Sequence, residues 1–195
     1  IVGNRAGKSF DRAAEDGFAV YSVSDAVQKA DVLALLFPDE SAADIYAEEI
    51  ASYLREGHTL LFAHGFNILY NLMQPPEFVD VVLAAPKGVG PMVRRLYEEG
   101  GGVASLVSVH QDASGHALQT ALGFAAAIGS SRSAILESTF KDETETDLFG
   151  EQAIICGGIP ALIEAAVDIL IEAGYPPELA YSECAHEVKL VIDLI

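Results

Sequence analysis

Short apolar runs alternate with helical segments over the first 138 residues, and no other feature constrains the fold as strongly. These short runs predict strands at 18–21, 32–37, 59–63, 79–84, 105–109 and 133–137. Helical patterns lie between them at 24–29, 42–54, 93–99 and 114–128, the last capped by Ser114. Near-continuous apolar strands separated by helices indicate an α/β domain with a mainly parallel sheet, covered on both faces.

The pattern changes after Thr139, where no strand signal returns. Three helical stretches follow at 144–156, 160–173 and 177–195, separated by glycine- and proline-containing breaks. The sequence therefore predicts two domains, an α/β domain at 1–138 and an all-helical domain at 139–195. The chain opens on what reads as the end of a strand and closes on an uncapped apolar helix, so we expect it to be a fragment.

Charge and composition exclude several classes of function. The chain has 29 acidic residues against 11 Lys plus Arg, for a net charge of −18, and such a surface repels a phosphate backbone. No apolar run reaches the ~18 residues of a membrane span. Cys156 and Cys184 lie in apolar helical patterns without metal-ligand spacing, which predicts two buried, reduced thiols in a cytoplasmic protein.

The segment Gly3-Asn4-Arg5-Ala6-Gly7-Lys8-Ser9 resembles a phosphate-binding loop but is one residue short of the Walker spacing. A strand-to-helix turn with Arg5, Lys8 and Ser9 could still bind a phosphate. In dinucleotide-binding folds the adenosine ribose lies at the end of the second strand, where basic residues suit a 2′-phosphate. Because 3–9 contains no acid, the loop favours NADPH over NADH. A plain solvated turn is the alternative.

Three later strands run into unusual residues: Pro38-Asp39, His64-Gly65-Phe66-Asn67, and Lys87-Gly88-Val89-Gly90. In open α/β sheets the ligand lies outside the carboxyl ends of the strands. His64 and Lys87 are therefore predicted to project toward the same edge of the sheet, which we call the crest. Taken singly, each has an ordinary structural explanation. Together at the binding edge they are candidate active-site residues.

Four carboxylates form two pairs at helical i, i+4 spacing, Asp147 with Glu151 and Glu183 with Glu187. Carboxylate oxygens are the ligands that Mg²⁺ prefers, and two such pairs suit a two-metal site. Acids on a solvated helix surface are the alternative. The second pair lies among apolar residues, where an unpaired buried carboxylate would be costly.

At these residues the chain resembles the ketol-acid reductoisomerase family over nearly its whole length. The segments that carry the resemblance are His64-Gly65-Phe66-Asn67, Ala85-Pro86-Lys87-Gly88, His110-Gln111-Asp112-Ala113-Ser114-Gly115, Glu143-Thr144-Glu145-Thr146-Asp147-Leu148-Phe149-Gly150-Glu151-Gln152, and Ala180-Tyr181 with His186-Glu187-Val188-Lys189-Leu190. The resemblance implies a Rossmann-type domain that lacks its first βα unit, followed by a helical domain that forms a knotted dimer. Because the helical region is short and not duplicated, it is similar to the short form of the family.

The resemblance also implies residue roles. Asp147 and Glu151 match ligands of two Mg²⁺ ions, and Glu183 and Glu187 match a second pair contributed by the neighbouring subunit of a homodimer. His64, Lys87 and Glu151 match the catalytic set, with Glu151 a candidate proton carrier. The expected cofactor-binding residues are Arg5, Lys8, Ser9, Pro38, Asp39, His64 and Gly90.

The implied reaction is Mg²⁺-dependent alkyl migration in 2-acetolactate or 2-aceto-2-hydroxybutyrate, followed by reduction with NADPH, or with NADH as the alternative. This reaction belongs to branched-chain amino-acid synthesis. Two departures concern the cofactor and the substrate: the first βα unit with its glycine-rich loop and the later helices with a substrate-binding serine are absent. Val89 stands where the family more often has proline.

Two rival functions remain open from the sequence. A 3-hydroxyacid-type dehydrogenase would share the two-domain layout and use a catalytic lysine without a metal. A non-catalytic binding module would keep the fold as an interaction surface. Intact His64, Lys87 and all four carboxylates disfavour the module.

Overall fold

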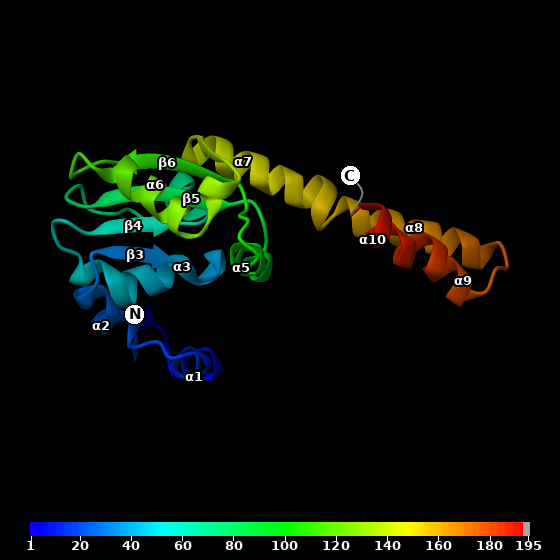
Figure 1. Cartoon of the computed structure of the whole chain (residues 1–195), viewed down its shortest axis with the longest axis horizontal. Coiled ribbons are helices and arrows are strands. Elements are labelled where there is room, and N and C mark those ends of the chain that lie inside the picture. Colours follow the sequence, from blue (N-terminus) through cyan, green and yellow to red (C-terminus); the bar gives the residue numbers. More distant parts are fainter. Residues whose placement is uncertain (193–195) are drawn as a thin grey trace. The chain divides into compact units, whose positions relative to one another are not determined.

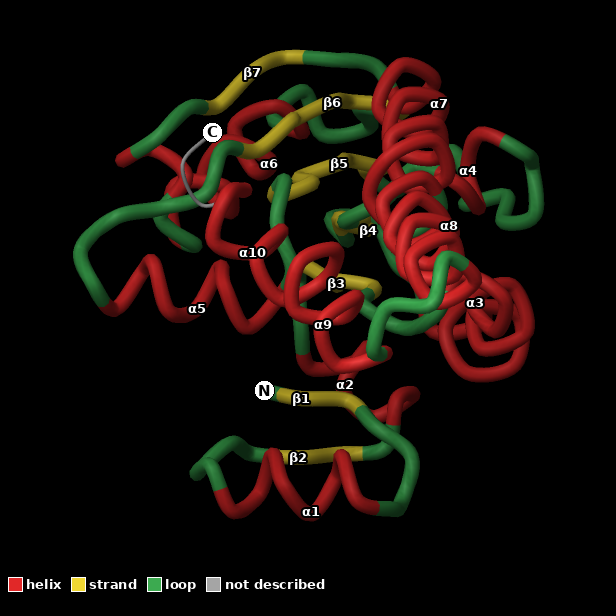
Figure 2. Tube along the Cα trace, turned by 90° about the vertical axis from the view of Figure 1, so that its right-hand side faces the viewer, coloured by secondary structure: helices red, strands yellow, loops and turns green. Residues whose placement is uncertain are grey.

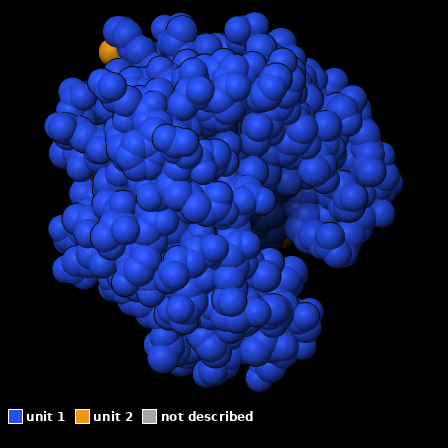
Figure 3. Space-filling view, turned by 90° about the vertical axis from the view of Figure 1, so that its left-hand side faces the viewer, with its two compact units in different colours: residues 1–144 blue, residues 145–195 orange. Residues whose placement is uncertain are grey.

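A computed structural model describes residues 1–192. The chain divides into two compact units, Ile1–Thr144 and Glu145–Ile195, coloured separately in Figure 3. The first unit is an α/β domain and the second is helical, which confirms the predicted fold class. Helix α7 (Phe140–Gly150) runs across the division.

The main sheet of unit 1 has five strands in the order β3-β4-β5-β6-β7 (Figure 1). Its strands are β3 (Val32–Leu35), β4 (Thr59–Phe62), β5 (Asp80–Pro86), β6 (Ser105–Gln111) and β7 (Ile135–Glu137). β3, β4 and β5 are parallel, β6 runs antiparallel to β5, and β7 is parallel to β6. Strands β1 (Val2–Gly3) and β2 (Val20–Tyr21) form a separate parallel pair (Figure 2).

Alternation along the central strands divides the core into two layers, because successive side chains point to opposite faces. Leu60, Phe62, Val81 and Leu83 face one layer. That layer also contains residues of α2 (Val23–Lys29), α3 (Asp39–Ile45), the π-helical turn η1 (Tyr46–Ile50) and α4 (Phe66–Leu69). The other layer contains α6 (Ala117–Ala127), and Figure 2 shows α6 on one side of the sheet with α3 and α4 on the other.

Helix α6 begins three residues later than predicted, and Ser114 is not its cap. The first helical residue follows His116, and the Ser114 hydroxyl donates to Asp80 Oδ2 at 2.7 Å. The Asp112 carboxylate instead accepts the backbone N–H of Gly115 and of Ala117. The hydroxyl is therefore held by a tertiary contact that a local capping rule does not include.

One side of unit 1 remains uncovered in this chain. Val32 is 43 % exposed and Leu36 is 67 % exposed, although Leu33 between them is buried. A groove of about 560 Å³ lies between the β1 and β3 edges, with Val2 and Gly3 on one side and 32–37 on the other. An edge strand from each of the two sheets thus borders this groove. The remaining helices of unit 1 are α1 (Lys8–Glu15), α5 (Gly90–Glu98) and the 3-10 turns η2 (Ala51–Tyr53) and η3 (Ser130–Arg132).

The described part of unit 2, residues 145–192, contains helical segments joined by turns and no strand. They are the end of α7, the π-helical turns η4 (Glu151–Ile155) and η5 (Ser182–His186), α8 (Gly158–Glu172), α9 (Pro177–Tyr181) and α10 (Glu187–Ile192). Ala180 is the only buried apolar residue among the described part of this unit. Large apolar side chains are exposed instead: Phe149, Ile154, Ile155, Leu162, Ile169, Ile171, Tyr175, Leu179, Tyr181, Leu190, Val191 and Ile192.

The cysteines of unit 2 are free, as predicted, but they are not buried in this chain. Cys156 is exposed and Cys184 is partly exposed. The apolar pattern around them gives a helix surface rather than a single-chain core. By length and composition alone, the stretch Phe140–Glu172 is apolar enough to cross a membrane, although helices from the cores of soluble proteins share these properties.

Candidate active site

The carboxyl ends of β4 and β5 bring His64 and Lys87 together. Phe62 pairs with Leu83 in parallel register, so the residues that follow both strands emerge at the same edge of the sheet. Both side chains contact one carboxylate, that of Glu143. The crest predicted from the sequence therefore exists, and its centre is a residue to which the sequence assigned no role.

Glu143 is 1 % exposed and accepts hydrogen bonds from three directions. Lys87 Nζ donates to Oε1 at 2.8 Å, and the Gly65 backbone N–H donates to Oε2 at 3.0 Å. His64 Nδ1 lies 3.1 Å from Oε2. Burial by itself would raise the pKa of Glu143, but the hydrogen bonds from His64 and Lys87 and their charges outweigh it and lower the pKa. Glu143 is therefore a buried anion that orients two cationic or polar groups.

Local structure explains why Glu143 reaches the crest. Helix α7 begins next to β7, and the Thr139 hydroxyl accepts the backbone N–H of Asp142 in its first turn. Gly65 is required at the contact: a Cβ there would lie 2.9 Å from the Phe140 carbonyl oxygen and closer still to the Thr144 hydroxyl. The signal for Glu143 was present in the sequence, since it stands four residues before Asp147 on one helix.

Asp39 and His64 line one small cavity of about 240 Å³ at the ends of β3 and β4. Asn67 Nδ2 donates to Asp39 Oδ1 at 2.7 Å, which fixes the first turn of α3. Pro38 is the residue before that helix. Among the described residues, the buried Asn67 Oδ1 has no hydrogen-bond partner.

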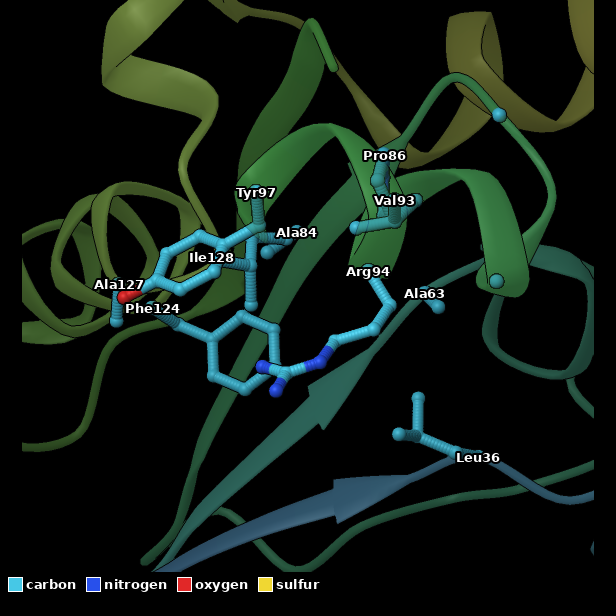
Figure 4. A pocket seen from close by; sticks show the side chains of 12 residues that line it. Leu36, Ala63, Ala84, Pro86, Val93, Arg94, Tyr97, Phe124, Ala127 and Ile128 are labelled. Carbon is cyan, nitrogen blue, oxygen red and sulfur yellow. The ribbon is translucent and has the colours of Figure 1, made fainter. Parts of the chain in front are cut away.

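A larger cavity of about 620 Å³ lies at the carboxyl ends of β3, β4 and β5, beside α5 and α6. Figure 4 shows Arg94, Tyr97 and Phe124 lining it together with small and apolar residues. Gly90, a predicted cofactor residue, belongs to the same lining. A mostly apolar cavity with a few polar groups at the crest of an open α/β sheet suits a dinucleotide or an organic substrate.

The proposed phosphate loop follows β1, as predicted. Lys8 and Ser9 lie in the first turn of α1, where Gly7 (φ 147°) provides no side-chain cap to the backbone amides. Two cations, a hydroxyl and uncapped amides fit an anionic group. The loop is not free of acids in space, however, because Arg5 Nε donates to Glu49 Oε1 at 2.8 Å.

All four predicted metal ligands belong to unit 2. Asp147 is partly exposed on α7, and Glu151 Oε2 accepts a hydrogen bond from Cys156 Sγ at 2.7 Å. Glu183 and Glu187 are exposed, so the apolar setting inferred from their neighbours is wrong for a single chain. Among the described residues, no group of three or more neighbouring donor atoms includes Glu151, Glu183 or Glu187. The carboxylate chemistry fits Mg²⁺, but one chain does not assemble the four ligands.

A mainly parallel sheet with polar side chains at its strand ends is the architecture of a dinucleotide-binding domain. Residues 1–134 match the family model of the acetohydroxy acid isomeroreductase NADPH-binding domain, and residues 140–195 match the ketol-acid reductoisomerase C-terminal domain. The chain belongs to the ketol-acid reductoisomerase family. This confirms the resemblance seen in the sequence.

Solved structures agree with this assignment. An NADH-preferring ketol-acid reductoisomerase from an uncultured archean is 46% identical with a TM-score of 0.95, over 100% of this chain and 59% of that one. The present chain thus spans less than two thirds of that relative. A putative oxidoreductase from Jannaschia sp. CCS1 (16% identity, TM-score 0.74, 97% of this chain and 71% of that one) shares the fold. So does a semialdehyde dehydrogenase NAD-binding protein from Cupriavidus necator (20%, 0.69, 93% and 68%).

Proposed function

We propose that the complete protein is a ketol-acid reductoisomerase, which rearranges a 2-hydroxy-3-keto acid with Mg²⁺ and then reduces it with a nicotinamide dinucleotide. The observation that carries this proposal is the buried Glu143 carboxylate bound by His64 and Lys87. It stands on the same helix as Asp147, in a chain whose two parts both match the family. The substrates are 2-acetolactate and 2-aceto-2-hydroxybutyrate.

The residues of this chain have separable roles in that reaction. Asp147 and Glu151 would hold Mg²⁺, which supplies Lewis-acid polarisation of the substrate oxygens when bound. Glu143 holds the Nδ1 edge of His64 and the Lys87 ammonium, so both are fixed toward the crest before substrate binds. Glu151 is the candidate proton carrier, because its carboxylate is one of the proposed Mg²⁺ ligands. It also accepts a hydrogen bond from the Cys156 thiol.

The cofactor is a nicotinamide dinucleotide bound along the crest. Arg5, Lys8 and Ser9 would bind its adenosine end, and Pro38, Asp39, His64 and Gly90 would contribute to the remainder of its site. We infer that a βα unit preceding Ile1 completes this site by inserting a strand between β1 and β3. The groove between these edge strands and the exposed side of β3 support this inference, as does the greater length of the relative.

The protein acts as a homodimer, or as a larger assembly of dimers. Unit 2 exposes many large apolar side chains and has one buried apolar residue among those described, so it requires a covering surface. Glu183 and Glu187 would reach the metal site from the partner subunit. Nucleic acid is not an expected partner, because a net charge of −18 repels a phosphate backbone. We expect the protein to associate with copies of itself in the cytoplasm, without a membrane partner.

The test uses the complete protein, 2-acetolactate and either nicotinamide dinucleotide. Consumption of reduced cofactor, followed by absorbance, is expected only with Mg²⁺ present, and chelation should abolish it. A metal-independent oxidation of 3-hydroxy acids would instead identify the dehydrogenase alternative. Absence of both activities, with dinucleotide binding retained, would favour a binding module.

A further inference from the structure

The contact between Arg5 and Glu49 joins segments that are 44 residues apart in the chain. Arg5 lies on the exposed loop after β1, and its side chain is 57 % exposed. Glu49 belongs to the π-helical turn η1 and is 25 % exposed. An acid from a different element thus lies at the loop expected to bind the adenosine end of the cofactor.

Glu49 is anchored more firmly than its partner. Tyr46 and Ile50, the ends of the same π-helical turn, are 7 % and 1 % exposed and belong to the core layer under the sheet. π-Helical turns are rare and frequently occur at functional sites. Because η1 is fixed by the core while the Arg5 loop is exposed, the carboxylate holds the guanidinium in place rather than the reverse.

The position of this pair gives it a consequence for cofactor choice. In dinucleotide-binding folds an acid at the end of the second strand binds ribose hydroxyls, whereas free basic residues accommodate a 2′-phosphate. Glu49 occupies the Nε donor of Arg5 and places a negative charge beside it. A 2′-phosphate would therefore meet a guanidinium that is already paired and a carboxylate of its own sign.

We propose that Glu49, through its ion pair with Arg5, is a specificity-determining residue that disfavours NADPH relative to NADH. This inference rests on the proposed function, since it concerns the cofactor of that reaction. It replaces the expectation from the sequence, in which an acid-free loop favoured NADPH. The 46%-identical relative that prefers NADH is consistent with it.

The test measures binding, independently of turnover, on the complete protein at low ionic strength, where surface charges are little screened. Dissociation constants are determined by calorimetry for NADH and NADPH, and for ADP and 2′,5′-ADP as probes that differ in the 2′-phosphate alone. The variants are Glu49→Gln, Arg5→Met and the two combined. Glu48→Gln is the matched control, because Glu48 is the exposed neighbour on the same turn. An exposed ion pair contributes little to stability, so Glu49→Gln should fold.

Glu49→Gln is expected to tighten NADPH and 2′,5′-ADP by about fivefold to tenfold, the effect of one unit charge a few ångströms from a phosphate dianion. NADH and ADP should change by less than about twofold, as should every ligand with Glu48→Gln. In the Arg5→Met background the gain from Glu49→Gln should be clearly smaller, because only the direct repulsion by the carboxylate is then removed and no guanidinium is released to bind the phosphate. An unchanged NADPH affinity in Glu49→Gln, an equal gain in Glu48→Gln, or a full gain without Arg5 would each overturn the proposal. Failure of the wild type to bind any nicotinamide dinucleotide would instead contradict the proposed function.

Discussion

Replacing Glu143 by glutamine removes the charge at the centre of the crest and keeps the side-chain size. The native carboxylate accepts from Gly65, Lys87 and His64. A glutamine offers one carbonyl oxygen, and its amide group would point a donor at another donor. The substitution therefore leaves at least one buried donor without an acceptor.

The magnitude follows from burial. Breaking a buried ion pair by removing one partner costs about 3–5 kcal/mol. The Lys87 side chain is 34% exposed, so its ammonium can turn toward water, and we discount the loss to about 2–3 kcal/mol. For a chain of this size that corresponds to a decrease in Tm of about 5–10 °C. The paired variant Glu143→Gln/Lys87→Met should be less destabilised than the sum of the two single variants by at least about 1 kcal/mol.

The assay is urea denaturation of the complete protein at one fixed protein concentration, because association shifts apparent stability. Glu48→Gln is the control, an exposed acid that should change the free energy of unfolding by less than about 0.5 kcal/mol. If Glu143→Gln also stays within about 0.5 kcal/mol of the wild type, the carboxylate is not the buried anchor that we describe.

Asp147→Asn in the complete protein should abolish both rearrangement and reduction and weaken Mg²⁺ binding measured by calorimetry; near-normal turnover without magnesium would contradict this role. Mixing inactive Asp147→Asn and Glu187→Gln subunits should restore activity toward half per mixed dimer, since one site then carries both lesions and the other neither. A mixture that stays inactive after confirmed subunit exchange would exclude a shared site. Burial, with a smaller contribution from Arg55, lowers the pKa of His58, so the unfolded chain binds its proton first and stability should fall as pH decreases below about 6.5. His58→Asn should reduce this dependence in denaturation measured at pH 7.5 and 5.5, and an unchanged dependence would show that His58 does not cause it.

The strands and the crest were predictable because burial on both faces of a parallel sheet produces continuous apolar runs. Strand direction was not, since β6 has the same composition whether it runs parallel or antiparallel to β5. The start of α6 was misplaced because Ser114 is bound by Asp80, a partner 34 residues away. Local rules thus located the elements, while contacts distant in sequence determined their pairing and their ends.

In the candidate site, too, local sequence rules missed contacts between residues distant in the chain. Spacing identified Asp147 and Glu151, but Glu143 was passed over although it stands four residues before Asp147, because spacing alone does not show which acid of an acidic helix is buried. Its role depends on three donors that arrive from β4 and β5, at 78, 79 and 56 residues' separation. The buried setting expected for Glu183 was also wrong, because an apolar helix pattern does not state which chain covers it.

The preference for NADPH or NADH could not be predicted from residues 3–9 alone. Residues 3–9 contain two cations and no acid, and a linear motif treats that composition as the environment of the phosphate. The field at the loop depends instead on charges within a few ångströms, whichever element they come from. Folding places η1 beside the end of β1, so that Glu49 pairs with Arg5 at 2.8 Å. Because η1 is anchored by two buried side chains, this acid lies at a fixed place beside the loop although it is distant in sequence. With Arg5 paired to Glu49, Lys8 is the cation of the loop that remains for a 2′-phosphate. The sequence had suggested two, Arg5 and Lys8.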